Sequence, residues 1–413
     1  MGMPWSARLV AAVCSGVLLA AGPVPGASAE LEPDESGVSL TLPAPAPHQV
    51  WLPDVVLRHS KLFDGDTGQM LGMIETTWSL TGRPPLLGRA RGELYVVEAV
   101  YERGHRGARR DFVTIYDATT LAVTGEIEIP PRSAEIGHGV AVVGLDDDER
   151  FLAVFNQDPS NSVSIVDLET RRFVEEIVIA GCALVYPTGP RSFGTLCGDG
   201  TALELQLDEQ GHEQRQVASD PIFDVVEDPL HDRGARDGER WLFSSFEGYL
   251  HEIDFSGAKP VVAARWSLFD ETQRSKKWRI GGTRHSALHR ETGQLYTLMH
   301  QGEKGSHKDP GMEVWVYDVK EQTRVRTIAP GSVLPAFVRP YMEIARGSWM
   351  DWVLGVVLPN PGVHSIAVTQ DDAPLLFVRH AEIGAVGVYD ATSGQHVRDL
   401  EEVGVAGAGI VVP

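Results

Sequence analysis

The sequence predicts an all-β fold, a seven-bladed β-propeller of four-stranded antiparallel blades, and three observations lead to this prediction. An alternating apolar strand that ends in Asp and enters a short turn occurs seven times. A second strand, introduced by a turn, precedes most copies, and another follows many of them. Convincing amphipathic helices are almost absent. The aspartates that end the repeated strands are Asp64, Asp117, Asp167, Asp208, Asp254, Asp318 and Asp390.

The spacing of these repeats favours one closed ring. Successive copies are 41 to 72 residues apart, and the shorter spacings match the roughly 40–50 residues of a propeller blade. No Gly/Ser-rich linker or block of like charges divides the chain. We therefore expect residues 30–413 to form a single propeller, with an irregular insertion at about residues 333–361, where the pattern is interrupted.

The repeated aspartates are expected to serve turns. An Asp at the end of a strand accepts hydrogen bonds from the backbone of the turn that follows it, so we do not assign these residues to calcium binding or catalysis. The glycine cluster of residues 404–409 superficially suggests a dinucleotide-binding loop, but no helix follows it. A closing turn and strand is the better interpretation.

The N-terminal residues have the pattern of a secretory signal peptide. A short basic leader precedes a mostly apolar stretch, residues 9–22, which is too short to span a membrane. Ala27 and Ala29 then form a small-residue cleavage site. We expect residues 1–29 to be removed before Glu30, and the mature protein to be periplasmic with no membrane span.

The net charge excludes one class of partner. The chain carries a formal charge of −21 at pH 7. Such an acidic protein repels the phosphates of nucleic acids and the surface of anionic membranes. We therefore expect no nucleic-acid binding.

Two cysteines remain outside the leader, Cys182 and Cys197, at equal distances from a turn signal at residues 188–191. In an antiparallel hairpin they would face each other with Cα atoms roughly 4.5–5.5 Å apart, which suits a disulfide. Export to an oxidising compartment favours the bond. We predict a structural disulfide, with two inert core thiols as the alternative.

No catalytic or metal-binding motif is recognisable. The nucleophile elbow, CxxC, HExxH and EF-hand patterns are absent from the sequence. His285 and His289 have the spacing of a metal pair on a helix, but their segment alternates as a strand, where four residues span roughly 13 Å. We expect them to line the central channel from an innermost strand, and we predict no metal site.

Two loops between the second and third strands of their blades are unusually long, residues 101–111 and 300–311. Corresponding loops of different blades emerge on the same face of a propeller. Both loops are glycine-rich, and we expect both to be net basic and to form a docking surface; independent solvated loops are the alternative. The expected docking residues are Arg103, His105, Arg106, Lys304, His307 and Lys308.

The sequence resembles one family over the whole mature chain. Residues 278–318, residues 95–130 and the cysteine hairpin are similar to the heavy (alpha) subunit of quinoprotein amine dehydrogenases, and closer to the aromatic amine branch than to the methylamine branch. The insertion at 333–361 departs from the family pattern. At Tyr101 the family usually has Phe, which lies in the substrate channel, and we expect Tyr101 to occupy that place.

The resemblance implies a scaffold subunit with no catalytic residue and no cofactor of its own. A small light (beta) subunit would carry the tryptophan tryptophylquinone cofactor and pair with this chain in an alpha2beta2 heterotetramer. The complex would oxidise primary, aromatic amines to aldehyde and ammonia, and would pass electrons to a cupredoxin of the azurin or amicyanin type. The alternatives are a self-sufficient propeller enzyme, such as a lactonase-like hydrolase, and a purely binding propeller.

Overall fold

The computed structural model describes residues 41–77, 85–104, 106–135, 141–330, 362–380, 385–404, 407 and 409–413. All of them belong to one compact unit, Thr41–Pro413. The expected signal peptide and the expected insertion at about residues 333–361 lie outside the described residues, so both stay predictions.

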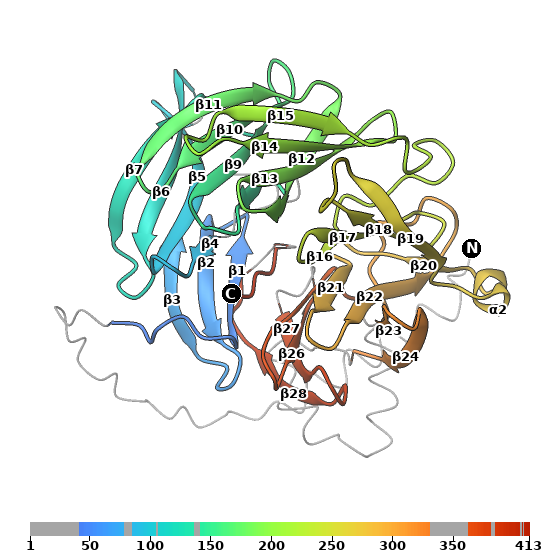
Figure 1. The fold of residues 1–413 in the computed structure, drawn as a ribbon. Coiled ribbons are helices and arrows are strands. Elements are labelled where there is room, and N and C mark those ends of the chain that lie inside the picture. The colour runs from blue at the N-terminus through green and yellow to red at the C-terminus, as the bar shows by residue number, and fades with distance from the viewer. Residues whose placement is uncertain are drawn as a thin grey trace, which may run out of the picture. The chain divides into compact units, whose positions relative to one another are not determined.

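The described strands form seven antiparallel sheets, which follow one another around a ring within this unit (Figure 1). This arrangement confirms the predicted seven-bladed propeller, and we number the blades in chain order. Blade 1 contains β1 (Gln49–Asp54), β2 (His59–Asp64) and β3 (Met70–Glu75). Blade 2 contains β4 (Leu86–Gly88), β5 (Glu93–Tyr101), β6 (Arg109–Asp117) and β7 (Val123–Ile129). Blade 3 contains β8 (Val143–Leu145), β9 (Phe151–Asn156), β10 (Ser162–Asp167) and β11 (Arg172–Val178).

The remaining four blades continue the same order from the innermost strand outward. Blade 6 differs because two short strands, β20 and β21, share the innermost position beside β22. Blades 4 to 7 contain β12 (Cys182–Gly189), β13 (Ser192–Cys197), β14 (Ala202–Leu207), β15 (Glu213–Ala218); β16 (Ala235–Asp237), β17 (Arg240–Ser244), β18 (Tyr249–Asp254), β19 (Val261–Ser267); β20 (Trp278–Ile280), β21 (Ser286–His289), β22 (Gln294–Gln301), β23 (Glu313–Asp318), β24 (Thr323–Ile328); and β25 (Ser365–Val368), β26 (Leu375–His380), β27 (Ala385–Asp390), β28 (His396–Leu400).

The burial of each strand follows its place in the blade. Every residue of β9 and β10 is buried, because these middle strands are covered on both faces by the neighbouring blades. The outermost strand β19 alternates between exposed and covered positions. Middle strands such as these are therefore buried on both faces, whereas outer strands show the period of two that marks a half-buried strand.

The seven repeated aspartates accept hydrogen bonds from turn backbones, as predicted. Asp117 accepts from the amides of Thr119 and Thr120 at 2.9 and 2.8 Å. Hydrogen bonds from the side chain of Thr119 and from this turn lower the pKa of Asp117 to about 2. The other six make equivalent bonds, so each copy of the repeat fixes its own turn.

The C-terminal segment closes the ring. Blade 1 has three strands of its own, and Val411 takes the innermost position beside β1. The amide of Trp51 donates to the carbonyl of Val411 at 2.8 Å, and the amide of Val411 donates back at 3.0 Å. Ile410 is fully buried against blades 1 and 7. In place of the expected closing turn and strand, the described part of this segment closes the ring through one isolated antiparallel bridge.

Cys182 and Cys197 form the predicted disulfide. They are direct partners in the β12–β13 hairpin, which turns at Pro190 and Arg191. Their Cα atoms are 3.8 Å apart, closer than the expected 4.5–5.5 Å. The strand register shifts directly after Ala183, beside the disulfide. The expected distance assumed a regular antiparallel ladder, and the hairpin is irregular at this point.

One helix is present among the described residues, α2 (Glu271–Ser275), between blades 5 and 6. Asp270 caps it, accepting a hydrogen bond from the amide of Gln273 at 2.7 Å. In the part of the chain that the structure describes, no helix is long and apolar enough to cross a membrane.

Candidate functional site

The long loops of blades 2 and 6 open on one face of the ring. β5 and β22 are both the second strand of their blade, and both run toward the loop that follows them. We call this side, where second strands lead into third strands, the loop face. Blades 2 and 6 are not neighbours in the ring, so the two loops occupy separate parts of the loop face.

A cavity of about 400 Å³ lies beside Tyr101 at the loop face, between blades 1 and 2. The Tyr101 hydroxyl donates to Glu135 Oε1 at 3.1 Å. Burial and the neighbouring Glu135 carboxylate raise the pKa of Tyr101. The phenol is therefore neutral and held in place by an acceptor.

The base of the Tyr101 loop is fixed by a charged pair. Arg109 is the cross-strand partner of Tyr101, and it donates to both oxygens of Asp111 at 2.6 and 2.7 Å. The Asp111 side chain is fully buried, and it also accepts from the hydroxyl of Ser133 at 2.5 Å. These hydrogen bonds to a buried carboxylate fix the base of the loop.

The cavity beside Tyr101 is acidic. Three carboxylates line it, Glu75, Glu98 and Glu135, together with one arginine, Arg58. Glu98 is oriented by the Thr114 hydroxyl at 2.5 Å. A cavity with this excess of carboxylates attracts a small organic cation.

The acidic lining was missed in the sequence, although a signal was present. Glu98 interrupts an otherwise apolar strand, which is typical of a polar group with a specific role. Glu135 gave no such signal, because it follows the end of a blade and is brought to Tyr101 only by the fold.

The loop after Tyr101 presents arginines to solvent. Arg103 and Arg106 are exposed, and a backbone hydrogen bond of 2.9 Å from the amide of Arg103 to the carbonyl of Arg106 closes the turn between them. Within the described residues, neither side chain makes an ion pair. His105 lies outside the described residues. The predicted basic character holds for residues 101–111, where arginines outnumber acidic residues.

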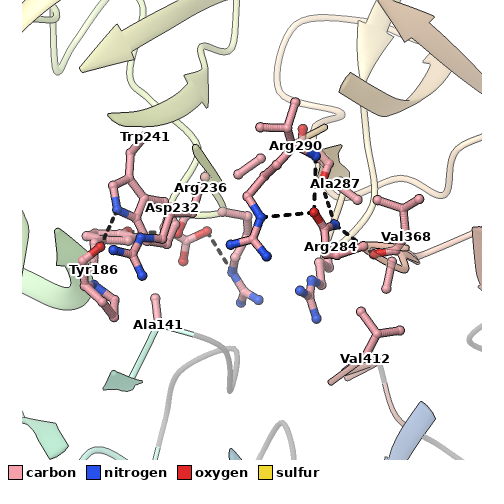
Figure 2. Close-up of a pocket in the computed structure, with 18 of the residues that line it drawn as sticks. Ala141, Tyr186, Asp232, Arg236, Trp241, Arg284, Ala287, Arg290, Val368 and Val412 are labelled. Atoms are coloured by element: carbon pink, nitrogen blue, oxygen red, sulfur yellow. Dashed lines mark hydrogen bonds and ion pairs between the residues drawn. The ribbon is translucent and has the colours of Figure 1, made fainter. Parts of the chain in front are cut away.

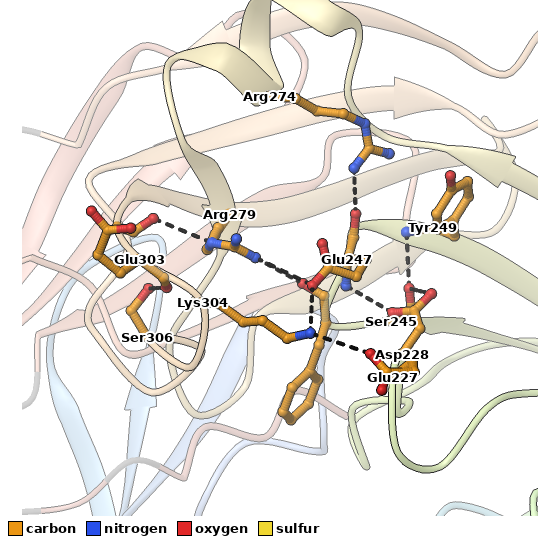
Figure 3. A network of polar contacts seen from close by, with 12 residues as sticks. Glu227, Asp228, Ser245, Glu247, Tyr249, Arg274, Arg279, Glu303, Lys304 and Ser306 are labelled. Atoms are coloured by element: carbon orange, nitrogen blue, oxygen red, sulfur yellow. Dashed lines mark hydrogen bonds and ion pairs between the residues drawn. The ribbon is translucent and has the colours of Figure 1, made fainter.

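Lys304, in the loop of blade 6, lies among acidic side chains (Figure 3). Its Nζ is 3.7 Å from Glu247 Oε1 and 3.8 Å from Glu227 Oε2. Arg279 approaches the same Glu247 oxygen at 3.9 Å. These exposed pairs contribute little to stability, but they cancel much of the positive charge expected at Lys304.

The loop of residues 300–311 is not net basic. Its two lysines are balanced by Glu303 and Asp309. Burial lowers the pKa of both His300 and His307, so these histidines are neutral at pH 7. The expectation of net positive charge is therefore wrong for this loop, because Glu303 and Asp309 balance its two lysines.

His307 points inward, whereas Lys308 is exposed. The His307 ring stacks on Phe246 with centroids 4.1 Å apart, which joins the loops of blades 5 and 6. It lines a cavity of about 290 Å³ together with His231 and His285. His307, one of the expected docking residues, therefore also packs against Phe246.

The two histidines of blade 6 differ in their surroundings. His285 precedes β21, faces the cavity of His231, and makes a 2.8 Å hydrogen bond with the Ser244 hydroxyl. His289 is buried farther along, where it contacts Thr292 at 2.8 Å. Among the described residues, His285 lines the cavity of His231 and His289 does not. The expectation that both histidines line the central channel stays a prediction. Across the described ranges, no group of three or more His, Cys, Asp or Glu side chains is arranged to hold a metal ion.

The fold defines this chain as a seven-bladed β-propeller with an acidic cavity on its loop face. The model of the methylamine dehydrogenase heavy chain (MADH) family matches residues 54–336. The chain therefore belongs to the methylamine dehydrogenase heavy chain family. The match ends near the start of the expected insertion.

Curated relatives agree with this assignment. The methylamine dehydrogenase heavy chain of Methylophilus methylotrophus is 25% identical over 347 residues, covering 83% of this chain and 77% of the relative. That of Paracoccus versutus is 25% identical over 383 residues, covering 90% and 81%. Both carry the name of the methylamine branch, so the expected closeness to the aromatic branch stays a prediction.

Solved structures resemble the chain in fold. A functionally unknown protein from Desulfotomaculum acetoxidans has a TM-score of 0.54 at 12% identity, with coverage of 88% of this chain and 98% of that protein. The dihydro-heme d1 dehydrogenase NirN has a TM-score of 0.52 at 18% identity, with coverage of 98% and 85%. At such identities the likeness concerns the fold alone.

Proposed function

We propose that this chain is the large, scaffold subunit of a periplasmic amine dehydrogenase that oxidises primary, aromatic amines to aldehyde and ammonia. The observation that carries the proposal is the family match over residues 54–336, supported by relatives named methylamine dehydrogenase heavy chain. A small light subunit supplies the tryptophan tryptophylquinone, which takes the electrons of the amine. A cupredoxin of the azurin or amicyanin type then accepts them, and the isolated large chain is inactive.

The residues around Tyr101 suit a role in admitting the substrate. A primary amine is protonated at neutral pH, and the carboxylates of Glu75, Glu98 and Glu135 provide a negative potential for it. The cavity volume of about 400 Å³ lies in the usual range for small-molecule sites and admits an aromatic ring. Tyr101 would border the path to the cofactor of the partner.

The docking role of the loop face rests on its exposed cations. Arg103, Arg106 and Lys308 are exposed on a chain whose net charge is −21. Positive groups on such an acidic surface steer an acidic partner and set its orientation more than they add to affinity. We propose that the light subunit contacts this face in an alpha2beta2 complex.

A charge-reversal variant tests the docking proposal. Arg103, Arg106 and Lys308 are exposed, so replacing them by Glu changes mainly the charge of the surface, and His307 is kept because it packs on Phe246. We expect association with the light subunit to weaken at least about tenfold, mainly through a slower association rate, as measured by surface plasmon resonance.

The matched control reverses the charge of Arg172, an exposed arginine at the start of the outer strand β11. The control variant is expected to associate with the light subunit at the same rate as the unmodified chain. Equal association rates for the triple variant and the control would contradict the docking surface, provided both variants keep the unfolding temperature of the parent.

A further inference from the structure

A third cavity, of about 240 Å³, lies between the innermost strands of the ring (Figure 2). Its lining comes from β12, from β16 and the segment before it, from β21 and its flanks, and from the end of β25. The lining contains one acidic residue, Asp232, and several arginines. We call it the arginine cavity, after Arg233, Arg236, Arg284 and Arg290.

The arginine cavity reverses the charge of the protein around it. Four guanidinium groups line the cavity together with one acidic side chain and the C-terminal residue Pro413, in a chain whose net charge is −21. In Figure 2 the side chains of Arg236, Arg284 and Arg290 lie around the same open space. Cations gathered in this way raise the free energy of the protein unless an anion balances them.

Arg233 is the least compensated of these groups. Its side chain is 5% exposed, and its one ion pair is a 3.2 Å contact from Nε to Asp232, which is itself half exposed. The Nη2 atom is buried and has no hydrogen-bond partner in the described part of the chain. Burial and the charge of Arg284 lower the pKa of Arg233 to about 9. A buried donor left without an acceptor destabilises the protein, and more so when it is charged.

Arg284 lacks a carboxylate partner among the described residues. Its Nη1 donates to the carbonyl of Ile410 in the C-terminal segment, and burial lowers its pKa to about 10. A guanidinium stays protonated at neutral pH all the same. Arg233, which is buried, and Arg284, which is half-buried, therefore line the same cavity, and among the described residues only Arg233 has a carboxylate partner.

Other contacts hold the remaining arginines in position without closing the cavity. Arg236 pairs with Asp147 at 2.6 Å, and Arg290 donates from Nε to Gln370 Oε1 at 3.1 Å. Each guanidinium has five N–H donors, so donors remain for a ligand. This leaves a set of oriented donors that matches the planar oxygens of a carboxylate or phosphate.

The walls opposite the arginines are apolar. Tyr186 and Trp241 pack edge to face with ring centroids 5.0 Å apart. The Tyr186 hydroxyl already donates to the carbonyl of Asp232, and the Trp241 indole N–H to that of Pro187, both at 2.8 Å. The rings therefore offer carbon surface to a ligand, next to the cationic donors.

We propose that the arginine cavity binds a small oxyanion, with its carboxylate or phosphate group on the arginines. An arginine cluster with a purely structural role would be expected to pair each buried guanidinium with a carboxylate of the chain. The proposal does not depend on amine oxidation or on a light subunit, since every residue involved belongs to this chain.

Isothermal titration calorimetry on the purified full chain tests the proposal. Two probes, inorganic phosphate and benzoate, are titrated in separate experiments. The ionic strength is held constant with chloride. We expect one saturable site per chain for at least one probe. Saturation by phosphate alone would identify a compact inorganic anion, and saturation by benzoate alone a carboxylate with an apolar body.

Variants localise the site. Arg290→Gln changes an exposed residue at the rim and should weaken binding about tenfold, as expected for loss of one charge-assisted contact. Arg233→Gln should weaken it further. Arg172→Gln, at an exposed arginine on outer strand β11, should leave binding unchanged.

Two results would overturn the proposal. The first is the absence of saturable binding for both probes, as expected if a carboxylate of the chain itself occupies the arginines. The second is binding that survives unchanged in Arg290→Gln and Arg233→Gln, which would mean that the probes bind elsewhere on the surface.

Discussion

Acid should destabilise this propeller through its buried histidines, and His285 is the clearest case. The side chain is buried and bonded to Ser244. Burial, followed by the charges of Arg233 and His307, lowers its pKa to about 3 from 6.5. Between these two values the unfolded chain binds a proton that the folded chain does not. The stability that His285 contributes is therefore fully present above pH 6.5 and is lost as the pH falls from 6.5 toward 3.

The expected magnitude follows from the size of the window. One pH unit within it corresponds to about 1.4 kcal/mol for a single group, so His285 alone should cost about 1 kcal/mol between pH 7 and pH 5.5. His231, whose pKa is also lowered by burial and by His285, acts in the same direction. The free energy of unfolding is measured by urea denaturation at both pH values.

The variant His285→Gln isolates this contribution. It removes the titrating group, so its loss of stability between pH 7 and pH 5.5 should be smaller than that of the parent by about 1 kcal/mol. The matched control is His212→Gln, which changes a histidine whose side chain is 56% exposed, and its loss should equal that of the parent. Equal losses in all three proteins would refute the reasoning.

The remaining predictions concern the hairpin of blade 4 and the acidic cavity. Replacing both Cys182 and Cys197 by Ser should lower the free energy of unfolding by about 3 kcal/mol, since the disulfide closes a loop with a sequence separation of 15. The parent protein in reducing agent should have the same free energy of unfolding as the variant. An unchanged urea midpoint in the variant would contradict the predicted stabilisation. In the assembled enzyme, Tyr101→Phe frees Glu135 from the phenol, so KM for a primary amine should fall about two- to tenfold with little change in kcat. Tyr249→Phe is the control, and an unchanged or higher KM in Tyr101→Phe would contradict the channel role.

The repeated strands made the blades predictable. A strand such as residues 109–117, which ends at Asp117 in a turn, carries its own pattern and its own turn acceptor, so seven copies were countable without tertiary information. Cys182 and Cys197 were paired because the hairpin between them is local. Local hydrogen bonds and the alternation of apolar and polar residues determine these features, and both depend on residues that are close together in the sequence.

The cavities depend on contacts between distant segments and were not predictable in the same way. Glu135 reaches Tyr101 across 34 positions, and Arg284 reaches the C-terminal segment across 126. The charge of the loop at residues 300–311 was misjudged for a different reason, because Lys304 and Lys308 are balanced by Glu303 and Asp309 in the sequence itself. The packing of His307 against Phe246, by contrast, is a property of the fold.

Co-purification tests the central claim most directly. The chain is expressed with the genes beside its own, carries an affinity tag, and is recovered from the periplasm. The account predicts a small cysteine-rich partner in equal amount, a quinone absorption band in the complex, and amine-dependent reduction of a cupredoxin that the isolated chain cannot perform. Recovery of the chain alone, or amine oxidation by the isolated chain, would contradict it.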